Sequence, residues 1–489
     1  MVYTDDLLYY ITIRSKLMVK IHGYPPATAA GHCAPLRSLV AIFQKRGIIV
    51  RFLMRKPTLF LIDIVILYGS LIAMLALRYQ GDITRYFGVH FLPFTIIFAI
   101  WLVVFYIVNL YDPRTLRNSI FFYSRLFEAI IAAAVISTSF FYLIPFFGIA
   151  PKTNLALFIV IFAILEFGGR SLFNNIVETK FKKLILIVGD NLQAQELAVF
   201  IKDNPQLGYT LKEIINTQQS DHLSEALATP NLDTVVISPD AYNISAVTEI
   251  FYKALGRKIN FYSLATFYER LTGRVPLGAI NQIWFLENLS EGNKSAYETF
   301  KRLGDIVFGL IFGIASLVLY PFVIIALQLN SPGPVFYTQT RIGRLGKSFK
   351  MIKLRTMVLN AEASTGAVWA RDGDDRITGI GKFLRRTRID ELPQLWNIIR
   401  GEMSLVGPRA ERPEFHDNLK QEVPFYEERY LIKPGLSGWA QINYPYGASV
   451  KDAAEKLKYD LYYIKNRSFF LDLGIILKTI RIAISQAGK

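Results

Sequence analysis

Four apolar stretches in the first part of the chain limit its fold more than any other feature. Each is close to the length of about 20 residues that a helix needs to cross a hydrocarbon core of about 30 Å. We therefore predict a membrane protein in which residues 57–175 form a four-helix transmembrane bundle. A leader over residues 1–56, without a signal-peptide pattern, precedes it. The predicted helices are Leu59–Leu77, Phe91–Leu110, Leu126–Phe147 and Thr153–Phe173.

Charged residues predict how these helices are oriented. Lysines and arginines cluster before the first stretch, between the second and third, and after the fourth. Because positively charged loops stay in the cytoplasm, we expect both ends of the bundle, and the chain that follows, on the cytoplasmic side. Within the fourth stretch, Glu166 and Arg170 are expected to extend to the membrane interface.

A fifth apolar run, Ile306–Leu329, is also long enough to cross a membrane. Basic residues flank it on both sides, so the charge rule gives it no direction. Pro321, near its middle, removes a helical hydrogen bond and predicts a kink. We predict a re-entrant helix over residues 300–330, with a plain, kinked fifth transmembrane helix as the alternative.

Residues 180–290 have the pattern of a Rossmann-like α/β domain. Lys183–Asp190 and Asp233–Asp240 are apolar runs typical of buried parallel strands, and Leu192–Lys202 is a predicted helix. A dinucleotide site would need GxGxxG after the first strand, but only Gly189 is present there. We expect a structural or regulatory domain without a cofactor, with a degenerate nucleotide sensor as the alternative.

Composition excludes several classes of protein. The chain has 489 residues, of which 52% are hydrophobic, so it is neither disordered nor fibrous. Its single cysteine, Cys33, rules out an intrachain disulfide and a zinc ribbon. The five histidines have no two-ligand spacing, so any metal would take oxygen ligands.

Glycines and cations alternate after the fifth apolar run, between Ser331 and Met357. We expect Lys353 and Arg355 to share one face of a strand and to bond phosphate oxygens. A solvated basic face beside anionic lipid headgroups is the alternative.

An acidic pair, Asp390 and Glu391, follows this basic region. Pro393 and Gly401 mark the start and end of a predicted helix, so the pair should lie at a helix N-terminus, which favours anions. One carboxylate could then approach a phosphorus atom while its neighbour holds a divalent cation. An ordinary N-cap is the alternative for Asp390. Nearby arginines favour phosphate handling: Arg385, Arg386, Arg388 and Arg409.

From about Lys301 to its end, the chain resembles the bacterial polyprenyl-phosphate sugar-1-phosphate transferases, which are monotopic phosphoglycosyl transferases. The resemblance rests on the motifs SPGPVFY, KxRTM, DELPQLWN, MSLVGPR, KPGLSGWAQ and DLYYIK. The stretches at Ala367 and Tyr444 are similar to the exopolysaccharide-type branch. The resemblance implies a mostly helical, monotopic catalytic domain over residues 331–489.

The resemblance further implies that a UDP-sugar gives its sugar 1-phosphate to undecaprenyl phosphate, with Mg²⁺ as cofactor and UMP as leaving group. This would start exopolysaccharide synthesis at the cytoplasmic face of the bacterial inner membrane. Asp390 would be the nucleophile that forms a phosphosugar intermediate, and Glu391 the metal ligand. A carboxylate is already ionised at neutral pH, so no histidine base is needed. The implied phosphate contacts are Lys353, Arg385 and Arg409, and the further candidates are Asp472, Gln441 and Pro321.

The chain departs from the family pattern at two positions. Asp375 and Ala410 stand where the family has proline. The neighbouring arginines, Arg376 and Arg409, are retained, so we expect less rigid loops and unchanged chemistry.

Two C-terminal segments are expected to lie in the headgroup plane of the membrane. Ser449–Lys465 begins with a Ser-x-x-Asp capping pattern, and Phe469–Ile484 is strongly apolar. A core helix with a terminal helix packed on it is the alternative.

Two other functions remain open. A metal-dependent glycosyltransferase could use Asp372, Asp374 and Asp375 as a DxD-like site and would release UDP instead of UMP. A transporter or scaffold would need a polar path through the bundle, but few ionisable residues other than Asp63 lie in the middle of a predicted span. Membrane lipid is an expected partner and nucleic acid is not. The sequence does not distinguish glucose, galactose and an N-acetylated sugar as the transferred sugar. A homo-oligomer is also compatible with the sequence.

Overall fold

The computed structural model describes most of the chain from residue 56 to residue 484. The described residues are 56–79, 82–144, 152–180, 182–289, 294–359, 361–363, 366, 368, 374–445, 447 and 449–484. Apart from Lys56, the predicted leader lies outside them.

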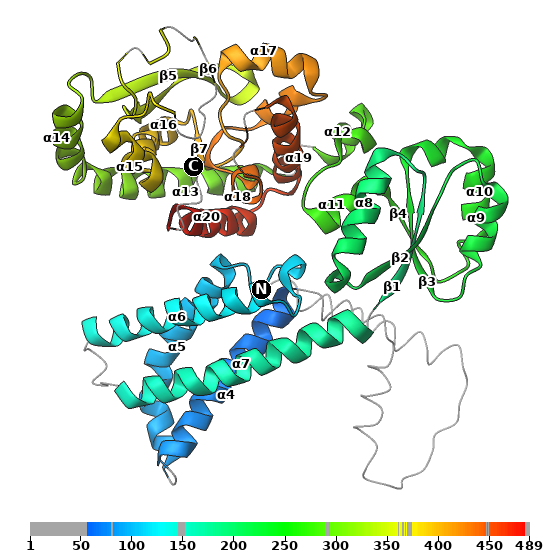
Figure 1. The fold of residues 1–489 in the computed structure, drawn as a ribbon, viewed down its shortest axis with the longest axis horizontal. Helices are drawn as coiled ribbons and strands as arrows, with labels where there is room; N and C mark the ends of the chain where they lie inside the picture. Colours follow the sequence, from blue (N-terminus) through cyan, green and yellow to red (C-terminus); the bar gives the residue numbers. More distant parts are fainter. Residues whose placement is uncertain are drawn as a thin grey trace. The chain divides into compact units, whose positions relative to one another are not determined.

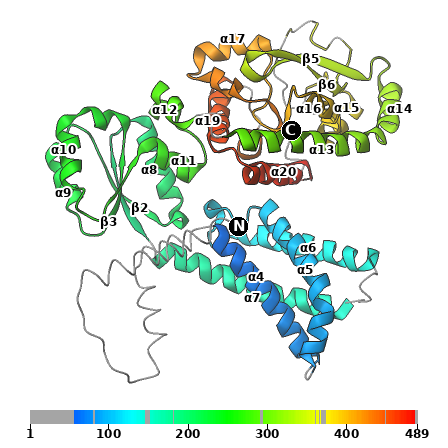
Figure 2. The same ribbon diagram turned by 180° about the vertical axis from the view of Figure 1, so that it is seen from behind.

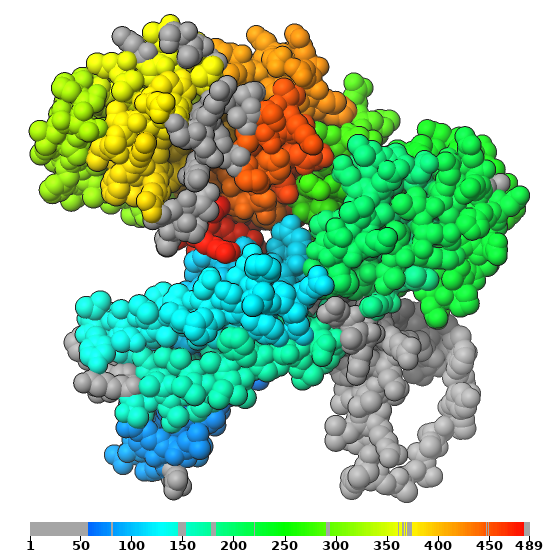
Figure 3. Space-filling model, viewed as in Figure 1, coloured from blue at the N-terminus to red at the C-terminus, as the bar shows by residue number. Residues whose placement is uncertain are grey.

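Four apolar helices come first, and each is long and apolar enough to cross a membrane. They confirm the four predicted spans, although the second and third begin six to eight residues earlier than the apolar runs suggested. Ser119 explains the early start of the third, because its side chain caps the helix by accepting from Phe122 N. In the space-filling view, α6 and α7 lie side by side (Figure 3). The helices are α4 (Lys56–Tyr79), α5 (Ile83–Ile107), α6 (Ile120–Leu143) and α7 (Lys152–Lys180).

A four-stranded parallel sheet forms the middle domain, with strand order β2-β1-β3-β4. The two predicted strands and the predicted helix are confirmed as β1, β3 and α8. Helices α8 and α11 cover one face of the sheet, and α9 and α10 cover the other (Figures 1 and 2). The elements are β1 (Lys183–Val188), α8 (Leu192–Asp203), β2 (Tyr209–Ile215), α9 (Ser220–Leu227), β3 (Leu232–Ile237), α10 (Ser245–Lys253), β4 (Asn260–Ser263) and α11 (Leu264–Thr272).

The turn after β1 is filled by the chain's own side chains. Gly189 has a φ of +109°, and a Cβ atom at this position would collide with Ser238. Asn191 caps α8 and donates its amide to the Ser238 hydroxyl (2.6 Å). Asn191 and Ser238 are thus hydrogen-bonded to each other at the sheet edge at which a dinucleotide would lie in a Rossmann fold.

The C-terminal part is mostly helical and contains two small sheets, the antiparallel β5-β6 hairpin and the parallel β7-β8 pair. Helix α19 begins with the predicted capping box of Ser449 and Asp452, and its Leu461 and Ile464 are buried in the core. The elements are α12 (Gln282–Asn288), α13 (Ser295–Leu317), α14 (Tyr320–Asn330), β5 (Phe336–Ile342), β6 (Ser348–Leu354), α15 (Gly379–Thr387), α16 (Gln394–Arg400), β7 (Ser404–Val406), α17 (Pro413–Glu422), β8 (Gly435–Ser437), α18 (Trp439–Asn443), α19 (Val450–Asn466) and α20 (Phe469–Ile484).

The fifth apolar run forms two helices, α13 and α14, which meet at an angle of 56°. Pro321 is the second residue of α14, where a missing N–H costs no helical hydrogen bond. The predicted kink is thus present, in a geometry that suits a broken span or a re-entrant loop. One face of α13 packs on α16 so closely that a Cβ atom on Gly309 would lie 3.1 Å from Ile399. The second half of α13 exposes large apolar side chains: Val307, Phe308, Leu310, Ile311, Phe312 and Ile314.

A buried cluster of charges joins two of the transmembrane helices. Arg170 Nη2 lies 2.6 Å from Asp63 Oδ2, and its Nε lies 2.7 Å from Glu166 Oε1. The Tyr111 hydroxyl donates to Asp63 (2.7 Å). The prediction that Glu166 and Arg170 extend to the interface is wrong, because all three charged side chains are buried against each other.

We expect the Arg170→Met variant to unfold at a clearly lower temperature in detergent than the intact chain. The substitution leaves two buried carboxylates without a counter-charge, a loss that typically costs about 3–5 kcal/mol. Arg78→Met, at an exposed position of α4, is the control. The triple variant Asp63→Asn/Glu166→Gln/Arg170→Met should recover most of the loss. Equal melting of the Arg170 and Arg78 variants would show that the cluster does not stabilise the bundle.

Candidate active site

Asp390 and Glu391 lie in η8 (Ile389–Glu391), a single 3-10 turn between α15 and α16. Arg388 turns the chain into it with a φ of +59°. The predicted helix ending at Gly401 is confirmed as α16, but the acids precede it, and the Glu391 amide donates to Arg388 O (3.2 Å). The acids therefore lie in the turn that leads directly into α16 and not within its first helical turn.

Three cations surround the Glu391 carboxylate. Lys353 Nζ and Arg409 Nη2 each lie 3.3 Å from Oε1, and Arg388 Nη1 lies 3.4 Å from Oε2. They come from β6, the segment after β7 and the end of α15. Burial alone would raise the pKa of Glu391, but these cations outweigh burial and hold its pKa well below the ordinary value. Glu391 is therefore an anion at any physiological pH.

Asp390 occupies a different environment from its neighbour. Its side chain is buried, and Oδ1 accepts no hydrogen bond from any residue that the structure describes. Burial first, and the negative charge of Glu391 second, raise the pKa of Asp390 to about 6. Adjacent carboxyl groups with opposite pKa shifts are typical of pairs with separate chemical roles.

The turn is fixed in place by α16. Asn397 Oδ1 accepts from Ile352 N (3.1 Å), and its Nδ2 donates to Lys350 O (2.8 Å). Arg302 of α13 donates to two carbonyls at the end of α16 (2.6 and 2.7 Å). These bonds set α16 against β6 so that Lys353, the next residue along the strand, reaches Glu391.

The structure corrects one prediction about the basic strand. Arg355 lies one residue beyond β6, and its guanidinium does not bond Glu391 as the ammonium of Lys353 does. It is buried and donates to backbone carbonyls of the turn that begins at Ser331. Arg385 of α15 does lie near the acids, because its charge acts on Asp390 while its Nε donates to Thr356 Oγ1 (2.9 Å).

The further candidates lie elsewhere. Asp472 pairs with Lys301 (2.7 Å) and accepts hydrogen bonds from Tyr297 and Tyr463, so it joins α13, α19 and α20. Gln441 of α18 donates to a carbonyl of β8 (3.4 Å). Pro321 belongs to the bend between α13 and α14. None of these contacts, which are those of the described residues, involves Asp390 or Glu391.

The DxD-like segment is only partly described. Arg376 donates to both carboxylate oxygens of Asp374 (2.8 and 2.6 Å), which lowers the pKa of that carboxyl group. Asp372 lies outside the described residues. Among those described, no group of three or more histidine, cysteine or acidic side chains could hold a metal ion.

The sequence alone did not identify three residues of the site as functional. Arg388 was noted only as part of a basic run, although its spacing of three residues from Glu391 could have indicated a pair. Arg302 and Asn397 bond partners that lie 45 or more residues away in the sequence. No local pattern indicates such contacts.

Comparison with known proteins gives the same region. Residues 296–486 match the family described as "Bacterial sugar transferase". The chain is 40% identical over 233 residues to UDP-N-acetylgalactosamine-undecaprenyl-phosphate N-acetylgalactosaminephosphotransferase of Aeromonas hydrophila. This match covers 47% of the chain and 53% of the relative, so the chain spans about half of that protein.

Two further relatives are named for glucose. The UDP-glucose:undecaprenyl-phosphate glucose-1-phosphate transferase of Caulobacter vibrioides is 37% identical over 208 residues, which are 42% of the chain and 78% of the relative. The undecaprenyl-phosphate glucose phosphotransferase of Komagataeibacter xylinus is 30% identical over 315 residues, 62% of the chain and 59% of the relative.

We expect the Asp390→Asn variant to be more stable than the intact chain at pH 7. An unfolded Asp loses its proton near pH 3.8 and folded Asp390 near pH 6. The folded state thus holds more protons between these values, and the free energy of unfolding falls as pH rises through this window. Thermal unfolding at pH 7 and pH 4 measures the effect, which should shrink at pH 4. Asp417→Asn, at an exposed position of α17, is the control. A difference that does not depend on pH would contradict the prediction.

Proposed function

The chain belongs to the bacterial sugar transferases, and we propose that it transfers a sugar 1-phosphate from a UDP-sugar to undecaprenyl phosphate. The products would be undecaprenyl-diphosphate-sugar and UMP. The names of the relatives support this reaction, because each name contains undecaprenyl phosphate and either glucose or N-acetylgalactosamine. We further propose that the product starts exopolysaccharide synthesis.

One observation carries the proposal: a buried carboxylate oxygen without a hydrogen-bond partner lies beside a cluster of cations. Asp390 Oδ1 is that oxygen. Among the described residues, Lys353, Arg388 and Arg409 all pair with Glu391, so three cations converge on one carboxylate. A diphosphate would supply further negative charge and place a phosphorus atom near a nucleophile.

The proposed reaction has two displacements at one phosphorus atom. Asp390 Oδ1 attacks the phosphorus that bears the sugar, the bond to the bridging oxygen breaks, and UMP leaves with the electron pair. An oxygen of undecaprenyl phosphate then attacks the same phosphorus, and the Asp390 carboxylate leaves. Because both nucleophiles are anions, neither step needs a base to remove a proton.

We propose that Glu391 holds Mg²⁺ together with the phosphates of the donor. Its oxygens lie 3.3–3.4 Å from three cations, farther than the roughly 2.7–2.9 Å of tight charge-assisted bonds. The carboxylate can therefore bind a further cation, provided that negatively charged phosphates arrive with that cation. One carboxylate plus substrate phosphates is a common Mg²⁺ site, and the ion would neutralise charge on the leaving phosphate.

The membrane-bound arrangement supports the lipid substrate. We propose that α13 and α14 form a re-entrant hairpin and that the active site lies on the cytoplasmic face of the bacterial inner membrane. The apolar exposed face of α13 and its buried contacts with α16 support the hairpin, because they join lipid contact and the catalytic turn in one helix.

Release of the nucleotide tests the reaction. In nanodiscs with Mg²⁺, undecaprenyl phosphate and a panel of UDP-sugars, we expect UMP only when the lipid phosphate is present. Asp390→Asn and Glu391→Gln should each lose at least about 10²-fold in rate, because each removes a charge that acts on the reacting phosphorus. Glu455→Gln, at a pair with Arg274 and Lys458, is the control. Release of UDP would favour the glycosyltransferase instead, and silence over the whole panel would favour the scaffold.

The rate should depend on pH through Asp390. Because only the ionised carboxylate attacks, we expect kcat/KM to rise with pH up to about 6 and then to level off. The same assay, at pH values from 5 to 8, measures this dependence. Glu455→Gln should give the same profile. A flat profile down to pH 5 would exclude Asp390 as the nucleophile or its raised pKa.

A further inference from the structure

The backbone that presents Arg409 is held at four successive carbonyl groups. The bonds are Gly435 N to Pro408 O (2.8 Å), Arg429 Nη2 to Arg409 O (3.0 Å), Arg341 Nη1 to Ala410 O (3.0 Å) and Ile342 N to Glu411 O (2.9 Å). Two of the four donors are side-chain guanidinium groups from distant parts of the sequence. We expected this loop to lose rigidity because Ala410 replaces a proline. These bonds give the loop another source of order.

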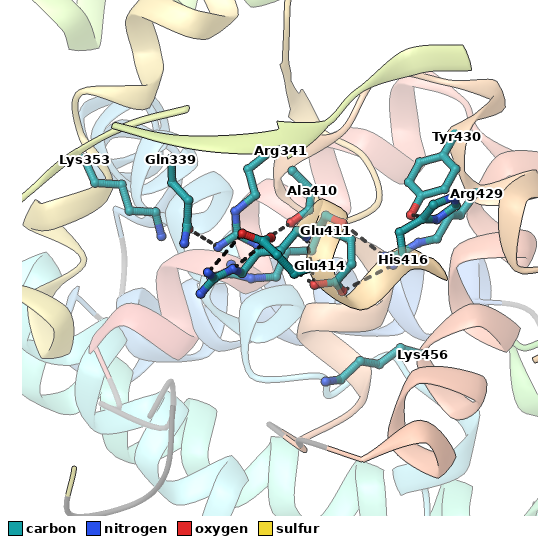
Figure 4. A network of polar contacts seen from close by, with 12 residues as sticks. Gln339, Arg341, Lys353, Ala410, Glu411, Glu414, His416, Arg429, Tyr430 and Lys456 are labelled. Atoms are coloured by element: carbon teal, nitrogen blue, oxygen red, sulfur yellow. Dashed lines mark hydrogen bonds and ion pairs between the residues drawn. The ribbon is translucent and has the colours of Figure 1, made fainter. Parts of the chain in front are cut away.

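Both guanidinium groups are themselves fixed. Arg429 is buried, and it also donates to Asp460 Oδ2 (2.9 Å) and to the Tyr426 hydroxyl (2.6 Å). Asp460, on α19, is 1% exposed. Arg341 has a side chain that is 14% exposed, and it also donates to Gln339 Oε1 (2.6 Å). Figure 4 shows Arg341 between Gln339 and Ala410, and Arg429 beside Tyr430.

Burial of these arginine side chains destabilises the fold unless their charges and N–H groups find partners. A buried guanidinium is stabilising only when counter-charges and acceptors satisfy it, and here the acceptors include the carbonyls of two consecutive loop residues. Charge-assisted bonds of this kind are stronger and more directional than neutral ones. They fix the main chain on both sides of the bond between Arg409 and Ala410. The Arg409 side chain then reaches Glu391 at 3.3 Å.

We propose that Arg341 and the pair Arg429–Asp460 are positioning residues, which hold Arg409 where it meets the phosphates of the donor. The proposal rests on the proposed function for the identity of that donor. None of the three residues need touch the substrate, since their effect passes through the backbone of residues 409 and 410. A small displacement of such a contact can cost a large factor in rate.

A double-mutant cycle tests this action. Affinity for UDP is measured by calorimetry on the full chain in nanodiscs, for Asp460→Asn and Arg341→Gln, each with Arg409 intact and in an Arg409→Ala background. With Arg409 present, we expect each substitution to weaken UDP binding about tenfold; in the Arg409→Ala background, we expect a change below about twofold. Glu455→Gln, on the same helix as Asp460, should change neither value.

Equal losses in both backgrounds, or no loss in either, would overturn the proposal. If Asp460→Asn melts too low to be measured, because it leaves Arg429 buried and unpaired, Arg341→Gln decides the question alone. Arg341→Lys, which keeps the charge, should restore part of the affinity. If the intact chain binds UDP with this coupling yet releases no UMP, only the proposed reaction fails. If it releases UMP without the coupling, only the positioning role fails.

Discussion

The shared Glu391 carboxylate is the interaction on which the catalytic domain depends. Its three cations come from a strand, a helix end and a loop that are separated in the sequence. Each of these elements must be held by its own contacts before the cations can meet one carboxylate. Asn397 fixes α16 to the strand, and Arg302 fixes α13 to the end of α16. The packing of the domain therefore brings three cations together around the Glu391 carboxylate, which offsets part of their mutual repulsion.

The sequence could predict what depends on neighbouring residues. Hydropathy alone locates the four membrane helices, because about 20 consecutive apolar residues have few other stable environments. Capping chemistry locates the start of α19 at Ser449 and the end of α16 at Gly401. The acids at 390 and 391 stand out because cations, a proline and a glycine surround them within about 20 residues. All of these signals are local.

What depends on distant partners could not be predicted. Arg170 looked like an interfacial residue because, in the sequence, only Glu166 lies near it; its second partner, Asp63, is 107 residues away. Arg355 looked like a neighbour of Lys353, because the two-residue period of a strand puts them on one face. The strand ends at Leu354, however, and the Arg355 guanidinium donates to a backbone carbonyl of the turn that begins at Ser331. Pattern rules fail where tertiary contacts decide whether an element continues.

The different environments of the two acids follow from the same charge balance. Lys353 and Arg388 favour the ionised form of both acids, but they contact only Glu391. Glu391 therefore stays ionised, whereas burial outweighs the cations at Asp390 and raises its pKa. Glu391 forms ion pairs with all three cations, while Asp390 keeps an oxygen without a partner among the described residues. An oxygen that no donor stabilises is more basic and more nucleophilic than one that is hydrogen-bonded. The opposite pKa shifts of the two acids therefore come from where the cations lie, and they do not require any difference between Asp and Glu as residue types.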